Sequence, residues 1–168
     1  MTSISFYDSP LGRLLMRAED DAVTGLWFIG QQHFPKELAA AAYMNEDSEA
    51  LIRLRLWLDE YFSGGRPDIS RLSLAPGGSE FRRAVWDILC QIPYGSSISY
   101  GQIARRLEAS LQSRVSAQAV GGAVAHNPIS IVIPCHRVLG AGGKLCGYAG
   151  GLDKKAALLS LEGISFTE

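Results

Sequence analysis

Residues 127–138 read NPISIVIPCHRV, an apolar run that leads directly into a cluster of reactive side chains. The run Ile-Val-Ile at residues 131–133 predicts a short buried strand. Pro134 ends this strand, because proline lacks the N–H that a central strand donates. The strand would therefore deliver a thiol, an imidazole and a guanidinium to one place in the fold, at Cys135, His136 and Arg137.

Cys135 is the candidate nucleophile. A free thiol has a pKa of about 8.5, so little of it is thiolate at neutral pH. His136 and Arg137 would raise that fraction by proton acceptance and by positive potential. Adjacent residues of an extended chain point in opposite directions, so His136 would reach the sulfur through a tight turn or a water molecule. The alternative is an inert buried thiol, which suits Cys90 and Cys146.

Arg137 has a second explanation, which is a structural ion pair. Glu162 is the natural partner of Arg137 or of His136. A carboxylate behind an imidazole that serves a thiol would complete a Cys-His-Glu relay. Sequence separation leaves open which of these contacts forms.

Three helices are predicted ahead of this segment. Ser79 is the N-cap of the first, which is followed by apolar residues at helical spacing and ends before Pro93. Ser99 or Tyr100 opens a second helix over residues 100–107, and a third covers roughly residues 116–126. Two short helices joined by a loop indicate a helix-turn-helix.

The third helix consists mostly of small residues and includes two adjacent glycines, Gly121 and Gly122. Each glycine costs about 1 kcal/mol relative to alanine in a helix interior, so a close approach to something must offset the cost. Tight packing against a neighbouring helix is the simpler explanation, and approach to an external partner is the other. The long polar side chains nearby are Gln118 and Arg114, so nucleic acid would be recognised by shape or backbone.

The first 78 residues predict a structural unit of sheet and helix. Residues 4–8, 13–18 and 22–30 are rich in branched and aromatic side chains and are separated by turn residues, as in three strands. An amphipathic helix is predicted over residues 47–62, and residues 68–79 are interpreted as a linker. No cluster of polar side chains in this half points to chemistry.

The composition is that of an ordinary globular protein of 168 residues, with 47% hydrophobic and 20% charged residues. No apolar run approaches the roughly 18 residues of a membrane span, and no signal peptide is recognisable, so a cytoplasmic protein is expected. Three cysteines without a CxxC pair argue against disulfides and a metal site. Residues 1–78 contain 7 Lys/Arg and 11 Asp/Glu, whereas residues 79–168 contain 9 and 6. The second half therefore either meets a polyanion or is basic by chance.

Three motifs of the second half resemble those of one family, in the same order. SYGQIA at 99–104 and AVGGA at 119–123 resemble its helix-turn-helix, and PCHRV at 134–138 resembles its acceptor-cysteine motif. The family is the O6-alkylguanine-DNA alkyltransferases, also called methylated-DNA–protein-cysteine methyltransferases. The resemblance implies an α/β (α+β) fold. A small three-stranded sheet-plus-helix domain of ribonuclease H-like type would occupy residues 1–78. A mainly helical domain with the helix-turn-helix and the acceptor cysteine would occupy residues 79–168.

The resemblance implies direct DNA repair. Such proteins bind double-stranded DNA through the minor groove and rotate the damaged guanine out of the stack. They then move the alkyl group from O6 of guanine, or from O4 of thymine, irreversibly onto the cysteine, so each molecule acts once. The resemblance implies a monomer that needs neither cofactor nor metal and contacts no membrane.

The resemblance also assigns catalytic roles. Cys135 would be the nucleophile, with His136 as its base through a water molecule and Glu162 behind His136. Asn127 would brace the turn and the thiol. Tyr100 would press on the target phosphate and help to protonate the leaving guanine at N3.

The remaining roles concern the base and the duplex. Tyr148 would stack on the base, the Ala149 N–H would face O6, and the carbonyls of Cys135 and Val138 would accept from the guanine amino group. The substrate pocket would thus comprise Tyr148, Ala149, Val138 and Ser130. The DNA-contacting set would comprise Gln118, Arg114, Ala119, Gly121, Gly122 and Arg137.

Two positions depart from the family pattern. Gln118 stands where the residue inserted into the base stack is usually an arginine, and Arg114 would substitute for it if the alignment shifts within residues 107–116. Ala149 stands where some members have serine, which leaves the main-chain donor intact. The alternatives are a lesion sensor that binds without transfer, a regulator with further metal-binding domains, and a Cys-His hydrolase that turns over.

Overall fold

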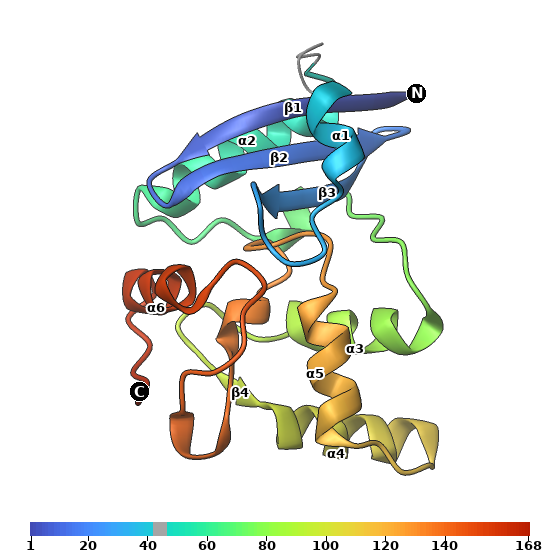
Figure 1. The fold of residues 1–168 in the computed structure, drawn as a ribbon, viewed down its shortest axis with the longest axis vertical. Helices are drawn as coiled ribbons and strands as arrows, with labels where there is room; N and C mark the ends of the chain where they lie inside the picture. The colour runs from blue at the N-terminus through green and yellow to red at the C-terminus, as the bar shows by residue number, and fades with distance from the viewer. Residues whose placement is uncertain (42–46) are drawn as a thin grey trace. The chain divides into compact units, whose positions relative to one another are not determined.

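The computed structural model describes residues 1–41 and 47–168 and divides the chain into two compact units (Figure 1). The first unit comprises Met1–Gly77 together with Pro128–Ser130, and the second comprises Gly78–Asn127 and Ile131–Glu168. The candidate nucleophile and the predicted helix-turn-helix both belong to the second unit. No helix among the described residues is long and apolar enough to cross a membrane.

The first unit is built on a three-stranded antiparallel sheet in the order β1-β2-β3 (Figure 1). β1 spans Thr2–Ser9, β2 spans Gly12–Glu19 and β3 spans Ala22–Phe28, which confirms the three predicted strands. Asp20 and Asp21 form the turn between β2 and β3 with positive φ angles of 46° and 68°. Aspartate tolerates this backbone conformation because its short polar side chain can hydrogen-bond locally.

Helices cover both faces of this sheet. α1 (Lys36–Ala41) and α2 (Glu49–Phe62) lie on opposite faces (Figure 1), and Leu38 of α1 packs against the buried cluster of Leu15 and Trp27. Successive side chains of a strand point to opposite faces. The two covering helices therefore explain why residues 14–16, Leu-Leu-Met, are all fully buried. α2 confirms the predicted amphipathic helix.

The predicted linker at residues 68–79 is wrong over most of its length. Ile69–Arg71 forms a short 3-10 helix, η2, and the segment after it pairs with β3 through Val23, whose N–H donates to the Ser73 carbonyl at 2.8 Å. Residues 128–130 pair with the same strand through Leu26, by hydrogen bonds of 2.8 and 2.9 Å. These two segments cover an edge of the sheet that would otherwise expose unpaired backbone groups.

Three helices open the second unit, as predicted. α3 (Glu80–Cys90) begins after its N-cap Ser79. α4 (Tyr100–Leu111) begins at a capping box formed by Ser99 and extends beyond the predicted end. α5 (Ala117–Ala125) follows after a short turn, which completes the predicted pair of helices.

Trp86 fastens α3 to α5. Its indole N–H is buried and donates to the Ala123 carbonyl at 2.9 Å, across 37 residues of sequence. That carbonyl lies in the last turn of α5, just before Asn127. The bond therefore fixes the end of the helix from which Asn127 extends.

A short parallel pairing brings the start of α4 beside the cysteine turn. β4 (Ile98–Ser99) pairs with β5 (Val138–Leu139). β4 leads directly into α4, and β5 follows directly from the 3-10 helix η3 (Cys135–Arg137). The chain ends with η4 (Ala141–Gly143) and α6 (Leu152–Leu161).

The predicted buried strand at residues 131–133 is wrong. The three side chains are buried, as expected, but the backbone turns instead of extending. Ile131 has a φ of 71°, which a β-branched residue rarely adopts. Cys135 therefore lies on a 3-10 turn that follows an irregular buried segment.

We expect Trp86→Phe to lower the free energy of unfolding by about 1–3 kcal/mol, because the Ala123 carbonyl loses its donor. Trp57→Phe is the matched control, since its indole N–H donates to the Asp68 carbonyl at 3.0 Å in the first unit. Urea unfolding should show a loss in both variants. Amide exchange should accelerate in α5 only in Trp86→Phe, and equal α5 exchange in both variants would contradict the assignment.

Candidate active site

The 3-10 turn η3 sets the geometry of Cys135 and His136. The Arg137 N–H donates to the Pro134 carbonyl at 3.0 Å, and the Val138 N–H donates to the Cys135 carbonyl. Adjacent side chains of such a turn need not point in opposite directions, as they do in a strand. The structure thus supplies the tight turn that a functional contact between the two residues requires.

Cys135 is buried, with 5% of its surface exposed. Burial raises the pKa of the Cys135 thiol, against smaller opposing effects of an Asn127 hydrogen bond, the positive charge of Lys155 and nearby backbone N–H groups. The thiol is therefore protonated at rest and needs a base. The prediction that Arg137 raises the thiolate fraction is wrong, because its guanidinium is paired with the Glu162 carboxylate and is not among the groups that lower the pKa of the thiol.

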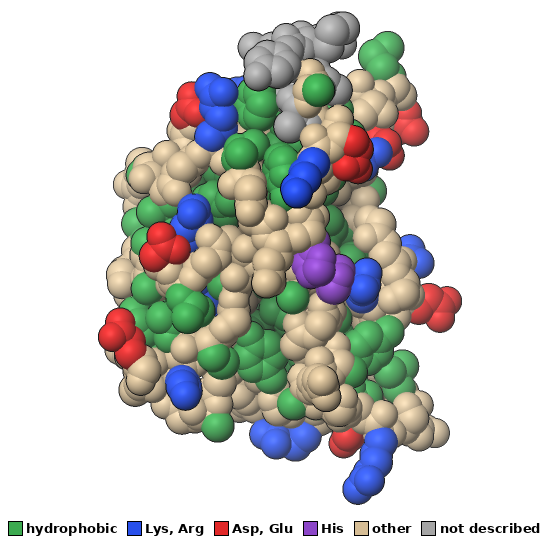
Figure 2. Space-filling model, viewed as in Figure 1, with side chains coloured by type: hydrophobic (Ala, Val, Ile, Leu, Met, Phe, Trp, Pro, Cys, Tyr) green, Lys and Arg blue, Asp and Glu red, His purple; other side chains and the backbone are tan. Residues whose placement is uncertain are grey.

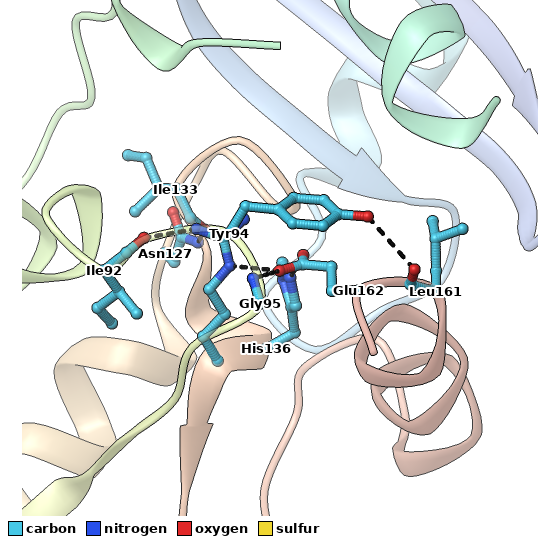
Figure 3. Close-up of polar contacts among 9 residues, drawn as sticks. Ile92, Tyr94, Gly95, Asn127, Ile133, His136, Leu161 and Glu162 are labelled. Atoms are coloured by element: carbon cyan, nitrogen blue, oxygen red, sulfur yellow. Dashed lines mark hydrogen bonds and ion pairs between the residues drawn. The ribbon is translucent and has the colours of Figure 1, made fainter. Parts of the chain in front are cut away.

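His136 and Glu162 form a buried pair (Figure 3), with the His136 Nε2 and Glu162 Oε2 atoms 2.5 Å apart. Burial lowers the pKa of His136, although Glu162 acts in the opposite direction, so the imidazole is neutral. An ionised carboxylate only accepts hydrogen bonds, so Nε2 must carry the hydrogen. The Nδ1 atom is then the basic nitrogen, and it is buried without a hydrogen-bond partner among the described residues.

Glu162 is the C-cap of α6 and accepts from three residues in two other segments of the chain (Figure 3). Besides His136, the Arg137 Nε donates to its Oε1 at 2.8 Å and the Gly95 N–H donates to the same atom at 3.2 Å. Burial alone would raise the pKa of Glu162, but His136 and Arg137 outweigh it and lower the pKa to about 2. The contacts to His136 and to Arg137 that the sequence left as alternatives both form.

Arg137 does not fit the DNA-contacting set in which the sequence analysis placed it. The residue is buried, with 9% of its surface exposed. Its Nη1 donates to the Ile92 carbonyl at 2.7 Å, and its guanidinium lies 5.8 Å from the ring centroid of Tyr94. A guanidinium committed to a carboxylate, a carbonyl and a ring is structural, so the ion-pair alternative is confirmed.

Asn127 and Tyr100 reach the cysteine turn from α5 and α4. The Asn127 side chain donates to the Ile133 carbonyl at 2.8 Å (Figure 3) and also hydrogen-bonds the Cys135 thiol, which confirms the expected bracing contacts. The Tyr100 hydroxyl donates to the Cys146 carbonyl at 3.2 Å. Burial raises the pKa of Tyr100, so its phenol keeps its proton.

The four predicted pocket residues do not all gather at this turn. The Val138 carbonyl lies at the head of β5 and accepts from Lys155 at 2.5 Å, and a carbonyl has a second lone pair for another donor. Tyr148 and Ala149 are half-buried in the loop before α6. Ser130 is buried in the first unit, where its hydroxyl donates to the Gln31 side chain at 3.3 Å. That contact does not support a place for Ser130 in the pocket.

The remaining DNA-contacting candidates lie on α5 and the turn before it. Arg114 and Ala119 line the same surface hollow of about 550 Å³. Gln118 is exposed. A Cβ built on Gly121 or Gly122 would meet nothing within 4 Å. The packing explanation for these glycines is therefore wrong within the part of the chain that the structure describes.

The charged surface near these helices is mainly positive. Along the lower edge of Figure 2, over α4, most of the charged side chains in view are Lys or Arg. Arg105, Arg106 and Arg114 are all exposed in this region. The positive charge of the second half is thus present on the helix-turn-helix, where a polyanion could meet it.

Lys155 is the residue of this site that the sequence analysis missed. Its side chain is fully buried, and its Nζ donates to the carbonyls of Val138, Cys146 and Gly147 at 2.5, 2.8 and 2.9 Å. The signal was present in the sequence. Lys155 shares one helical face with Leu158, Leu159 and Glu162, and all four are buried.

Fold and site together define a two-unit α+β protein whose helix-turn-helix unit contains a buried thiol beside an imidazole–carboxylate pair. Two family models match the chain. The "6-O-methylguanine DNA methyltransferase, ribonuclease-like domain" covers residues 3–76, and the "DNA binding domain" of the same name covers residues 80–164. The chain therefore belongs to the 6-O-methylguanine DNA methyltransferase family. The predicted family and fold class are confirmed.

Relatives cover nearly the whole chain. The methylated-DNA–protein-cysteine methyltransferase of Haemophilus influenzae is 37% identical to this chain over 164 residues. The match covers 98% of this chain and 88% of the relative. One from Methanosarcina acetivorans is 39% identical over 159 residues, covering 95% and 97%. A crystal structure of Mycobacterium tuberculosis OGT in complex with DNA superposes with a TM-score of 0.78 at 38% identity, covering 95% of this chain and 91% of that one.

Glu162→Gln should lower the free energy of unfolding at neutral pH by about 3–5 kcal/mol, because it leaves a buried guanidinium without its carboxylate. The Glu162 pKa is lower in the folded chain than its ordinary value of 4.5. The carboxylate therefore contributes stability above pH 4.5, which is lost as the pH falls towards 2. Urea unfolding across this range should show a weaker acid dependence in Glu162→Gln.

Glu60→Gln is the matched control for this prediction. Glu60 pairs with Arg71 at 3.1 Å, but both side chains are about half exposed. Such a pair contributes at most about 1 kcal/mol. Equal losses of stability in Glu60→Gln and Glu162→Gln would refute the central place given to Glu162.

Proposed function

We propose that this chain repairs alkylated DNA directly, by moving an alkyl group from O6 of guanine, or from O4 of thymine, onto the Sγ of Cys135. The observation that supports this best is the buried Cys135–His136–Glu162 arrangement in a helix-turn-helix unit that matches the family's DNA-binding domain. Residues 79–168 would bind DNA and accept the alkyl group, and residues 1–78 would have a structural role. The protein would act as a cytoplasmic monomer.

The proposed transfer begins with loss of the thiol proton. His136 accepts it at Nδ1 through a bridging water, and the imidazolium that forms is stabilised by the Glu162 carboxylate. The Sγ then attacks the alkyl carbon, forming the S–C bond as the C–O6 bond breaks. The guanine leaves with a proton supplied by Tyr100 at N3, and the proton on His136 restores that of Tyr100. Overall, one proton moves from Cys135 to the base.

The thioether has no route back to a thiol in this scheme. Each molecule therefore transfers once. The Val138 carbonyl would accept from the guanine amino group, Tyr148 would stack on the base, and the Ala149 N–H would face O6. A base can reach these groups only outside the duplex, and extrusion costs a few kcal/mol, less for a mispaired lesion.

The proposed docking element is α5, lying in the minor groove. Gly121 and Gly122 present bare backbone on this helix, and the absence of side chains there allows the close approach that a narrow groove demands. Gln118 would insert into the base stack, and Arg114 would contact a phosphate from the preceding turn. Few base-reading side chains are available, so recognition would depend on shape and on the lesion.

Intact mass tests the transfer. After incubation with excess duplex DNA that contains O6-methylguanine, the wild type should gain one methyl group per chain, mapped to Cys135, and then stop. Cys135→Ala should gain none but bind the duplex with unchanged Kd. Cys146→Ala is the control and should gain one. Methylation of Cys135→Ala would exclude Cys135 as the acceptor. Binding by the wild type without a mass gain would identify a lesion sensor, and repeated release of product would identify a hydrolase.

Gly122→Ala should weaken DNA binding without lowering the stability of the protein. The added methyl meets nothing within the described protein, and alanine favours the helix by up to about 1 kcal/mol, so the free energy of unfolding should stay equal or rise. The duplex Kd should rise several-fold, because the methyl obstructs the groove. Ser160→Ala in α6 is the control for helix propensity alone. A Kd for Gly122→Ala that matches the control would remove α5 from the interface.

A further inference from the structure

A buried cation on α6 has no part in the proposed proton path. Lys155 is fully buried, whereas the neighbouring Lys154 is only half-buried. The carboxylate on the same helical face, Glu162, is engaged by other partners, and no described carboxylate lies within ion-pair distance of Lys155. Burying an ammonium without a counter-charge is costly unless its donors are all used.

The donors of Lys155 are all used. An ammonium has three N–H donors, and the Nζ has three carbonyl acceptors within 2.9 Å. One acceptor, Val138, belongs to β5, which follows the cysteine turn. The other two, Cys146 and Gly147, belong to the loop that leads to Tyr148. A single side chain therefore ties the acceptor turn to the loop.

The same loop is held from a second side. The Tyr100 hydroxyl donates to the Cys146 carbonyl, which Lys155 also binds, and the Lys155 Nζ lies 6.0 Å from the centroid of the Tyr100 ring. A Cβ on Gly147, whose φ is 64°, would lie 3.2 Å from the Tyr100 hydroxyl. The loop backbone is thus pressed close to Tyr100, and the ammonium maintains that approach.

We propose that Lys155 is a positioning residue for alkyl transfer, whose ammonium fixes the loop at residues 146–148 against β5. This inference rests on the proposed function, in which that loop presents Tyr148 to the base. Positioning of this kind matters because a displacement of about 1 Å at the reacting atoms can cost about 100-fold in rate. The alternative is a lysine that contributes only to folding.

The first test compares Lys155→Met with Lys154→Met. Both remove one positive charge, but only the first removes the three buried donors. Lys155→Met should lower the transfer rate at saturating O6-methylguanine duplex about 100-fold. Its duplex Kd, measured in a Cys135→Ala background, should stay within about twofold of the value for Cys135→Ala alone. Lys154→Met should match the wild type in both. A wild-type transfer rate in Lys155→Met, with only a lower Tm, would overturn the proposal.

Lys155→Arg separates charge from geometry. A planar guanidinium keeps the charge but cannot direct three donors to these carbonyls as an ammonium does. Because the charge that lowers the pKa of Cys135 is kept, the rate at which iodoacetamide alkylates Cys135, followed against pH, should be close to that of the wild type. Alkyl transfer should remain at least tenfold slow. Full recovery of both rates would show that charge alone matters, and would overturn the positioning role.

A measurement on the wild type covers the case in which Lys155→Met fails to fold. Burial lowers the pKa of Lys155 to about 8, against the opposing effects of Cys135 and Cys146. As the pH rises through about 8, the amine loses one donor and the charge. The saturating transfer rate should fall and amide exchange at residues 145–148, corrected for its intrinsic pH dependence, should rise. If neither the transfer rate nor the corrected amide exchange changes across this pH range, the proposal is overturned.

The other titratable groups that face Lys155 do not explain such a fall. His136 is already neutral because its pKa is lowered, and Tyr100 keeps its proton because its pKa is raised. Ionisation of Cys135 would raise the rate. Failure of the proposed repair function can be distinguished from failure of the proposed role of Lys155. If the wild type gains no methyl group, the repair function is refuted. Amide exchange at residues 145–148, which needs no alkyl transfer, still decides whether Lys155 fixes the loop.

Discussion

The buried carboxylate of Glu162 is the constraint on which the chemistry of the second unit depends. It accepts hydrogen bonds from His136 and Arg137 of the cysteine turn and from the Gly95 N–H, so it joins α6 to two other segments of the chain. A buried charge is tolerated only when every partner is in place, so these segments share one stable arrangement. The same carboxylate fixes which nitrogen of His136 bears the hydrogen. The fold of the unit and the protonation state of its base therefore have one cause.

This arrangement makes the reactivity of Cys135 conditional. Burial raises the pKa of the thiol, and the neutral His136 beside it can accept a proton. A thiol in this state resists general electrophiles in water, because it is neither ionised nor exposed. Reaction then requires a substrate that brings its alkyl carbon to the sulfur while the base takes the proton. For a protein that would act once, such selectivity preserves the acceptor for the right lesion.

The elements that could be predicted from the sequence are those specified locally. Strand alternation, helical spacing and the caps Ser79 and Ser99 depend on near neighbours in the chain, and the structure has them as predicted. Residues 131–133 were mistaken for a strand because burial alone cannot distinguish a strand from a turn, and the φ of Ile131 is imposed by its surroundings. Lys155 was not predicted as a site residue because a lysine is ordinarily exposed, although the sequence pattern places it on an apolar helical face.

Under the proposed function, α5 has a surface open to DNA at the expense of its own stability as a helix. Gly121 and Gly122 weaken it by about 1 kcal/mol each, and no contact within the described protein repays that cost. A glutamine at position 118 supplies reach and hydrogen bonds but no charge, so attraction to phosphates must come from elsewhere. Arg114 and the exposed arginines of α4 would provide it under the proposed function. If α5 enters the groove, steering toward DNA and insertion into the base stack are then separate tasks of separate side chains, and each can change without the other.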